Sequence, residues 1–210
     1  MNIGIIGSGK MGVSIGKLWA AKNHNIYFAA LTLEESKAAA ESINGSVKFG
    51  SISDAVDFAD VILFSIPYSA VKKVIKETGS LKNKIIIDCI NPLSPDARTL
   101  LIGHSSSAAE EISKLSPGAS VVKAFNTVAS PVLESGNIIF GDVKPTMFYC
   151  GDDKNAKSIV SKLIQDTGFE PVDAGPLINA RYLEPLAALI IQLAFEQEMG
   201  TNIALKLLKR

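Results

Sequence analysis

The first nineteen residues, MNIGIIGSGKMGVSIGKLW, contain the feature that most constrains the fold. Residues 2–6 have the apolar pattern of a buried strand, and residues 13–21 have that of a helix. Between them, Gly7, Gly9 and Gly12 form G-x-G-x-x-G, which binds the pyrophosphate of a dinucleotide when a strand precedes it and a helix follows. The three glycines allow a tight turn, close approach of the pyrophosphate, and close packing of helix on strand. A glycine-rich turn without a ligand is the alternative, but this context predicts a dinucleotide site at the helix N-terminus.

Strand-like and helix-like segments alternate along the rest of the chain. The expected strands are residues 26–30, 47–49, 61–65, 85–89, 121–125, 146–150 and 170–173. The expected helices are residues 34–42, 52–58, 68–77, 108–115 and 155–166, with a further helix around Leu186, Leu189, Ile190 and Leu193. Uniformly apolar strands are typical of a parallel sheet covered on both faces. We therefore predict an α/β fold, a Rossmann-type doubly wound and mostly parallel sheet with extra C-terminal strands and helices.

The predicted organisation has two parts. Residues 1–145 would form the nucleotide-binding Rossmann domain, and residues 146–210 a C-terminal extension packed on it as one structural unit. One apolar side of the last helix would cover the sheet. The other side would be buried either in a homodimer, which we predict, or by residues 203–208. Arg181 and Glu184, three residues apart, are interpreted as a surface ion pair of small energetic value.

Composition argues against several classes of partner. The formal net charge is zero, so no nucleic acid or anionic membrane is expected as partner. The N-terminal apolar run is short and enters the glycine loop, unlike a signal peptide. The apolar residues 187–195 fall short of the ~20 that span a bilayer. We expect a cytoplasmic protein without a metal site, in which Cys89 and Cys150 are buried free thiols.

The end of the second strand normally selects the cofactor. An Asp or Glu about 20 residues beyond the glycines would bind the ribose 2′-hydroxyl of NAD. Ala30, Leu31 and Thr32 stand at this point, and the first carboxylates, Glu34 and Glu35, come later in the helix. The missing acid favours NADP, although no Arg is present and NAD stays open. The side chains available to a 2′-phosphate are those of Ser8, Lys10, Thr32, Ser36 and Lys37.

The loops at the carboxyl ends of the other strands are predicted to complete the site, because ligands of such sheets bind there. Lys123 and Asn126 are the polar groups best placed near a nicotinamide; the alternatives are a snorkelling lysine and a strand-capping asparagine. The predicted cofactor-binding residues are Gly7, Ser8, Gly9, Lys10, Met11, Gly12, Ala30, Leu31, Thr32, Ser65, Ile66, Pro67, Ala70, Asn91, Pro92 and Ser130.

A second set of residues is predicted to receive the hydride acceptor. The acceptor pocket would contain Asn126, Val128 and Leu177. Residues 173–179 would close it as a lid, because Gly175-Pro176 provides a sharp turn. Asn126 is the candidate catalytic residue, and no obligatory acid or base is expected.

Six segments together carry a family resemblance. The glycine loop with SIPYSAV, INPL, VVKAFNTV, YCGDD and DAGPLINARYLEPL resembles the F420-dependent NADP oxidoreductases, over nearly the whole chain. It is also similar to the cytosolic reductase domain of the six-transmembrane metalloreductases. The resemblance implies a Rossmann domain that binds NADP(H) and passes hydride to or from a small-molecule redox acceptor, either the deazaflavin F420 or a flavin such as FMN or FAD. Two positions depart: Ala30-Leu31 replaces a common Ser-Arg, and Asn126 stands where deazaflavin enzymes can carry a His.

The scarcity of acid–base residues favours transfer between two rings. Reduction of a carbonyl needs a proton donor beside the hydride acceptor, and His24 and His104 are poorly placed for this. A flavin or deazaflavin takes hydride directly, since the chemistry belongs to the cofactor. Three alternatives stay open. They are a hydroxyacid or pyrroline-carboxylate reductase, for whose helical second domain there is no room, a flavin-assisted ferric or quinone reductase, and a non-enzymatic NADP-binding sensor or partner subunit.

Overall fold

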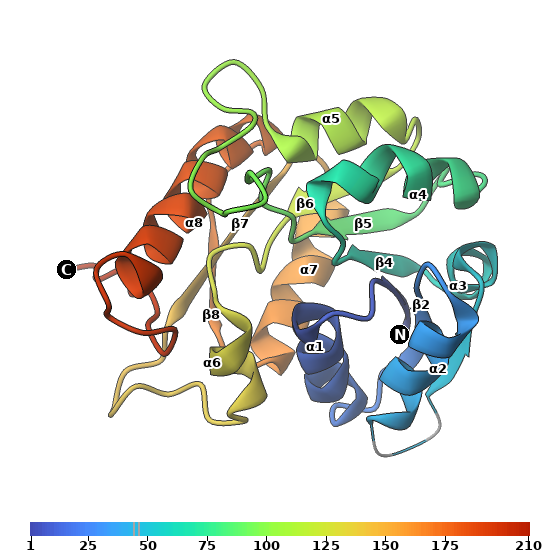
Figure 1. Ribbon diagram of the computed structural model, residues 1–210, viewed down its shortest axis with the longest axis horizontal. Coiled ribbons are helices and arrows are strands. Elements are labelled where there is room, and N and C mark those ends of the chain that lie inside the picture. Colours follow the sequence, from blue (N-terminus) through green and yellow to red (C-terminus); the bar gives the residue numbers. More distant parts are fainter. Residues whose placement is uncertain (44, 46) are drawn as a thin grey trace.

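One sheet forms the centre of the molecule. The computed structural model describes residues 1–43, 45 and 47–210, and within them the sheet has eight strands in the order β3-β2-β1-β4-β5-β6-β7-β8 (Figure 1). The strands are β1 (Asn2–Ile6), β2 (Asn25–Ala29), β3 (Lys48–Gly50), β4 (Val61–Phe64), β5 (Ile85–Asp88), β6 (Ser120–Lys123), β7 (Thr146–Gly151) and β8 (Glu170–Asp173). Strands β1 to β6 are parallel to one another. The predicted doubly wound, mostly parallel fold is confirmed.

Helices cover both faces of this sheet. The α-helices are α1 (Lys10–Ala20), α2 (Leu33–Glu41), α3 (Ile52–Phe58), α4 (Val71–Glu77), α5 (Ala108–Leu115), α6 (Ser130–Glu134), α7 (Lys154–Asp166) and α8 (Ala180–Phe195). Short 3-10 turns, η1 (Tyr68–Ala70) and η2 (Leu177–Asn179), precede α4 and α8. Helix α1 begins three residues earlier than predicted, and α6 was not predicted.

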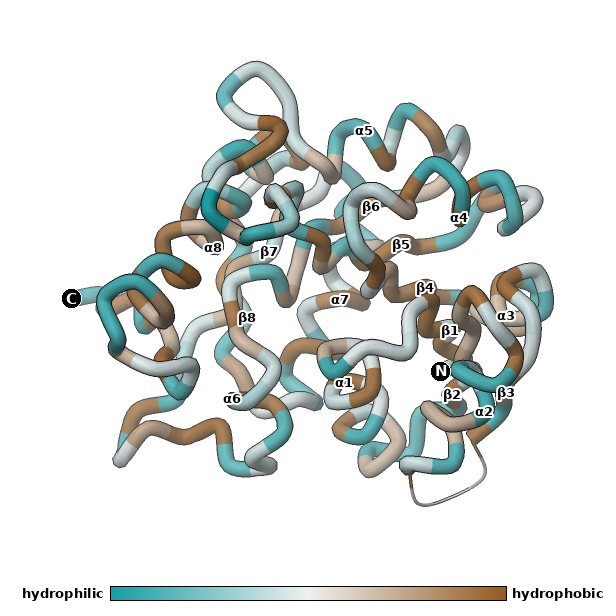
Figure 2. The backbone as a smooth tube through the Cα atoms, in the orientation of Figure 1, coloured by the Kyte–Doolittle hydropathy of each residue, from teal (hydrophilic) through white to brown (hydrophobic). Residues whose placement is uncertain are grey.

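Alternating strand residues point into two separate hydrophobic clusters. Ile5 and Leu63 face the cluster formed with α1, α2, α6 and α7, whereas Ile6 and Phe64 face the one formed with α3, α4, α5 and α8. Figure 2 shows β1 and β4, at the centre, as the most continuously hydrophobic part of the tube. Burial on both faces explains why these strands are uniformly apolar in sequence.

Strand β7 reverses the direction of the chain. It pairs antiparallel with β6, with Lys123 opposite Cys150 and Val122 opposite Gly151. Strand β8 is parallel to β7, with Asp173 opposite Tyr149, so both strands run antiparallel to β6. Helix α8 follows η2, and it reaches Lys123, the last residue of β6, through Glu184 near its start.

Helix α8 is buried along one side only. Its stretch Leu177–Phe195 is long and apolar enough to cross a membrane by length and composition, a test that the core helix of a soluble protein also passes. Leu183 and Ala187 are buried, whereas Tyr182 is 74% exposed and Leu189 is 54% exposed. The C-terminal segment runs beside β7, where Thr146 N donates to Leu205 O at 2.8 Å.

Candidate dinucleotide and acceptor site

The three glycines of the loop between β1 and α1 have distinct surroundings. Gly7 has φ +120°, and a Cβ there would lie 2.1 Å from Ser65 O. A Cβ on Gly12 would lie 2.6 Å from Gly7 O, so this position holds α1 close to the loop. A Cβ on Gly9 would meet no atom within 4 Å. Gly7 and Gly12 are thus required by the fold, whereas Gly9 faces open space that a ligand can occupy.

The N-terminus of α1 is free to bind an anion. No side chain caps it, whereas side-chain oxygens cap α2, α3, α5 and α7. Its first backbone N–H groups and the positive end of the helix dipole therefore face the space beside Gly9. This is the arrangement that binds pyrophosphate in dinucleotide folds.

A cavity of about 180 Å³ adjoins this loop, at the carboxyl ends of β1, β2 and β4. Nine of the predicted cofactor residues line it: Gly7, Ser8, Gly9, Ala30, Leu31, Ser65, Ile66, Pro67 and Ala70. Glu35, Ile6, Ile52 and Val74 complete the lining. An apolar wall with polar groups at one side suits the adenosine end of a dinucleotide.

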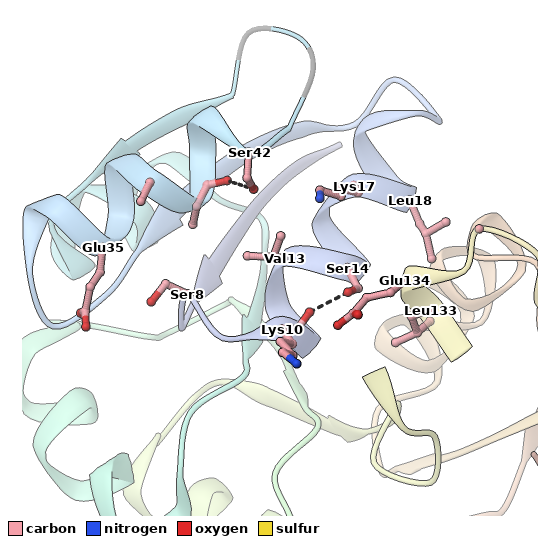
Figure 3. Close-up of a pocket in the computed structure, with 13 residues that line it drawn as sticks. Ser8, Lys10, Val13, Ser14, Lys17, Leu18, Glu35, Ser42, Leu133 and Glu134 are labelled. Atoms are coloured by element: carbon pink, nitrogen blue, oxygen red, sulfur yellow. Dashed lines mark hydrogen bonds between the residues drawn. The ribbon is translucent and has the colours of Figure 1, made fainter. Parts of the chain in front are cut away.

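A wider groove lies along the flank of α1, between α2 and α6, with a volume of about 830 Å³ (Figure 3). Lys10 lines this groove with Ser14, whose hydroxyl donates to Lys10 O at 2.7 Å. Met11 instead packs against the hydrophobic cluster beneath α1. Ser8 and Glu35 line both the groove and the smaller cavity, so the two spaces share a border there.

The end of β2 holds a carboxylate that the sequence analysis excluded. Glu35 N donates to Thr32 Oγ1 at 3.2 Å, and Thr32 N donates to Glu35 Oε2 at 3.3 Å. This reciprocal capping box brings the Glu35 side chain back from α2 to the strand end, so the prediction that no acid stands there was wrong. The spacing T-x-x-E was the signal that could have found it. Ser36, predicted as a phosphate ligand, is fully buried and bonded to Ala30 N at 2.8 Å.

Two asparagines join the loops that follow β5 and β6. Asn91 Nδ2 donates to Asn126 O at 2.9 Å, and Asn126 Nδ2 donates to Asn91 Oδ1 at 3.0 Å and to Leu183 O at 2.9 Å. The side-chain N–H donors of Asn126 are therefore used in hydrogen bonds within the fold, as expected for a strand-capping asparagine. Within the part of the chain that the structure describes, the side-chain oxygen of Asn126 is an acceptor without a partner.

Two buried oxygens beside this pair have no partner within the described residues: Asn126 Oδ1 and Thr127 Oγ1. Both residues are only 4% exposed. The turn that presents them contains Phe125 at φ +64°, a strained conformation for a bulky residue and one that clusters at functional sites. Buried polar atoms normally have a partner, so these oxygens indicate a ligand or water position. Thr127 was missed by sequence reasoning, which had no signal to separate it from neighbouring apolar residues.

A fully buried ion triad lies directly beneath the asparagine pair. Lys123 Nζ lies 2.9 Å from Asp88 Oδ2 and 2.8 Å from Glu184 Oε1, and also donates to Ile90 O. Burial by itself would lower the pKa of Lys123, but Asp88 and Glu184 outweigh it and raise this pKa. Burial raises the pKa of Glu184, against the opposing effect of Lys123. The ammonium of Lys123 is enclosed by these partners, so it is not directed at a nicotinamide; its position near one stays a prediction.

Glu184 joins this triad to helix α5. Its two oxygens accept from Ala108 N at 2.9 Å and from Ala109 N at 3.2 Å, so it also caps α5. The surface pair predicted between Arg181 and Glu184 is therefore corrected. Arg181 instead binds Glu110, with its Nε and Nη2 at 2.8 and 2.7 Å from the carboxylate.

The residues predicted around the acceptor separate into different places. Leu177 N donates to Asp152 Oδ1 at 2.9 Å and its side chain is buried in the hydrophobic core, so it does not project over a ring as predicted. The segment 173–179 is bonded to β7, where Ala174 N donates to Tyr149 O at 2.7 Å and Gly151 N donates to Gly175 O at 3.1 Å. Val128 is 6% exposed in the core cluster below α1. Pro92 is buried beside Asn91, and Ser130 is the first residue of α6.

The ring of His24 lies away from the carboxyl ends of the strands. His24 Nε2 lies 2.9 Å from Asp166 Oδ2, and His24 Nδ1 lies 3.3 Å from the N-terminal amine, at the amino end of β1. Among residues 1–43, 45 and 47–210, no group of three His, Cys, Asp or Glu side chains is arranged to hold a metal ion. Cys89 and Cys150 are free and buried, as predicted.

Comparison with known proteins confirms the resemblance. Residues 2–92 match the family model described as NADP oxidoreductase, coenzyme F420-dependent. The chain is 25% identical over 209 residues to the F420-dependent NADP reductase of Methanothermobacter marburgensis, covering 92% of each protein. It is 27% identical over 184 residues to the metalloreductase STEAP3 of Rattus norvegicus, covering 88% of this chain but only 36% of that protein.

A solved structure extends the likeness to the whole fold. A protein of Arthrobacter sp. FB24, suggested to be an F420-dependent NADP reductase, superimposes with a TM-score of 0.86 over 100% of both chains at 23% identity. At this identity the match shows a shared fold. It includes the extension after residue 145, which the family model does not reach.

Proposed function

We propose that this chain, whose residues 2–92 match the F420-dependent NADP oxidoreductase model, is an NADP(H)-dependent oxidoreductase that passes hydride between a nicotinamide and a deazaflavin or flavin ring. The dinucleotide would place its adenosine in the cavity beside Gly7 and its pyrophosphate on the N-terminus of α1. Its nicotinamide would extend across the carboxyl ends of β4 and β5 toward Asn126.

The observation that carries this proposal is the pair of unpartnered oxygens at Asn126 and Thr127. A nicotinamide carboxamide has an NH2 group that can donate to Asn126 Oδ1 and a carbonyl that can accept from the Thr127 hydroxyl. Because Asn126 Nδ2 is already held by Asn91 and Leu183, its oxygen has one orientation. The site would thus position the ring for transfer without reorganisation.

The surroundings of Lys123 and His24 favour a flavin or deazaflavin ring as hydride acceptor over a carbonyl, which needs a proton donor. Lys123 is enclosed in its triad and both ring nitrogens of His24 are engaged near the opposite edge, so neither is placed to donate a proton to substrate. A flavin or deazaflavin needs from the protein only contact, orientation and exclusion of water. The strand ends provide the groups for orientation.

Stopped-flow oxidation of NADPH in the presence of F420, FMN or FAD tests this function. We expect hydride transfer to at least one ring acceptor, with a ferric chelate reduced only when a flavin is added. Direct reduction of the chelate without flavin would favour a metalloreductase activity, the second candidate, which the 27% identity to STEAP3 supports. Tight NADPH binding without turnover of any acceptor would identify a sensor and overturn the enzymatic proposal.

We propose further that the protein is a cytoplasmic homodimer joined through α8. The exposed apolar residues on the outer side of this helix are Tyr182, Leu189 and Phe195. A second copy would remove them from water. Sedimentation equilibrium distinguishes the dimer from a monomer.

A further inference from the structure

The cavity of about 180 Å³ beside Gly7, where we propose that the adenosine binds, is called the adenosine cavity below. Its lining, as far as the structure describes it, contains one charged side chain, and a negative charge is unexpected in an NADP site. Of the thirteen residues that line the cavity in the described part of the chain, Glu35 is the only charged one. The other polar groups are the hydroxyls of Ser8 and Ser65 and the backbone of the glycine loop. Any ribose substituent placed at the end of β2 therefore meets a carboxylate.

The position of this carboxylate is determined by the capping box. Glu35 Oε2 accepts from Thr32 N at 3.3 Å, and no partner within the described residues is assigned to Oε1. Figure 3 shows Glu35 extending from α2 toward the glycine loop, on the same side as Ser8. The side chain is held beside Ala30 and Leu31, where a doubly wound fold places the adenosine ribose.

The nearby lysines do not lie in this cavity. Lys10 lines the adjoining groove beside α1, and Lys37 pairs with Glu41 on the exposed side of α2 at 3.7 Å. A 2′-phosphate would consequently approach the Glu35 carboxylate without a cation from the cavity wall between them. Like charges at this distance repel, whereas a ribose hydroxyl can donate to the free carboxylate oxygen.

We propose that Glu35 is the residue that sets cofactor choice, binding the ribose 2′-hydroxyl of NADH and opposing the 2′-phosphate of NADPH. This inference rests on the proposed function, since it requires that the cavity binds a dinucleotide. It assigns to the chain the use of NADH in addition to NADPH. The residue that discriminates between NADH and NADPH would thus lie in α2, not at the end of β2.

The test compares the dissociation constants of NADH and NADPH by calorimetry in the wild type, Glu35→Gln and Glu34→Gln. Glutamine preserves the hydrogen bond to Thr32 N, so Glu35→Gln removes the charge and retains the cap. Glu34→Gln is the matched control, because Glu34 lies in the same helical turn, is exposed and does not line the cavity.

Glu35→Gln is expected to shift the ratio of the two dissociation constants toward NADPH by about tenfold, as one charge-assisted contact would. Glu34→Gln should change the ratio by less than about twofold, since Glu34 does not line the cavity. An unchanged ratio in Glu35→Gln, a shift toward NADH, or an equal shift in Glu34→Gln overturns the role of Glu35 alone. A wild type that binds neither dinucleotide overturns both this role and the proposed function.

Discussion

Asn91 and Asn126 are joined by two hydrogen bonds, side chain to backbone at 2.9 Å and side chain to side chain at 3.0 Å. The pair links the loop after β5 to the loop after β6 and leaves one acceptor, Asn126 Oδ1, without a partner among the described residues. The donors of Asn126 thus hold the fold together, and experiment must decide whether its unpartnered oxygen also has a chemical role.

Thr127→Val tests the hydroxyl beside this pair. No protein hydrogen bond to Thr127 Oγ1 exists in the described part of the chain, so removing the hydroxyl should not lower the free energy of unfolding. If the hydroxyl contacts the carboxamide, hydride transfer should slow by roughly tenfold while NADPH affinity changes little. Transfer at the wild-type rate would show that the hydroxyl contacts only water.

Asn126→Leu is expected to slow hydride transfer and leave NADPH affinity nearly intact, because the pyrophosphate supplies most ground-state binding. It should also lower the free energy of unfolding by about 1–3 kcal/mol, since Leu183 O and Asn91 Oδ1 lose their donor. Stopped-flow and denaturant unfolding measure the two effects. A mutant that is destabilised but transfers hydride normally would reduce Asn126 to a strand cap.

Gly9→Asp should abolish NADPH binding without unfolding the protein. A Cβ at this position meets no atom within 4 Å, and the added carboxylate would occupy the place of the pyrophosphate. Gly103→Asp is the control, because it adds the same charge at another open glycine. Calorimetry that finds unchanged affinity in folded Gly9→Asp contradicts the assignment of the loop.

Leu31→Arg should shift the ratio of the NADH and NADPH dissociation constants toward NADPH by about 1 kcal/mol, through a charge-assisted contact with the 2′-phosphate. Leu31 is 61% exposed at the rim of the adenosine cavity, so the longer side chain has room. Leu101→Arg, at an exposed position away from the cavity, should leave the ratio unchanged. A ratio in Leu31→Arg equal to that of the wild type would contradict the placement of the ribose beside Leu31.

Lys123→Met should lower the free energy of unfolding by about 3–5 kcal/mol, because it leaves two buried carboxylates without their cation. The exposed Lys22→Met should change it by less than about 0.5 kcal/mol. The raised pKa of folded Lys123 means that its contribution is complete below its ordinary value of 10.5 and is lost as pH rises through the folded value. Urea titrations should therefore show the difference between wild type and Lys123→Met shrinking above pH 10.5. A difference independent of alkaline pH would contradict this.

The two thiols should be unreactive at neutral pH in the folded protein. Burial raises the pKa of Cys89 and of Cys150 to about 12, so almost no thiolate, the reactive form, is present. A maleimide should label both cysteines in denaturant and neither in buffer. Rapid labelling of native protein would show that a thiol becomes exposed by local opening.

The order of strands and helices could be predicted because its signals are local. Hydrophobic runs and caps within a few residues indicated α3, α5 and β8 with the bounds that the structure shows. The glycine loop and the residues of the adenosine cavity were predictable for the same reason, since one strand–turn–helix unit brings most of them together.

The residues that were misplaced depend on contacts across the sequence. Lys123 meets Glu184 across 61 positions, a pairing that no local pattern reveals. The reversal of β7 was not predicted either, and it brings Leu177 to Asp152, at the loop that follows β7. Glu35 is an exception, because its signal is local: the capping box joins Thr32 to a residue three positions later. The prediction of cofactor choice considered only the residues at the end of the strand.

The contacts of Glu184 mean that the nucleotide-binding half is not a separable module. A fragment ending at residue 145 would keep Lys123 and Asp88 but lose Glu184. The Glu184 carboxylate pairs with the Lys123 ammonium and caps α5. During synthesis this corner of the sheet cannot be completed until α8 has left the ribosome, although β1 to β6 emerge far earlier. A nascent chain stalled before α8 should therefore fail to order Asn126, whose Nδ2 donates to Leu183 O.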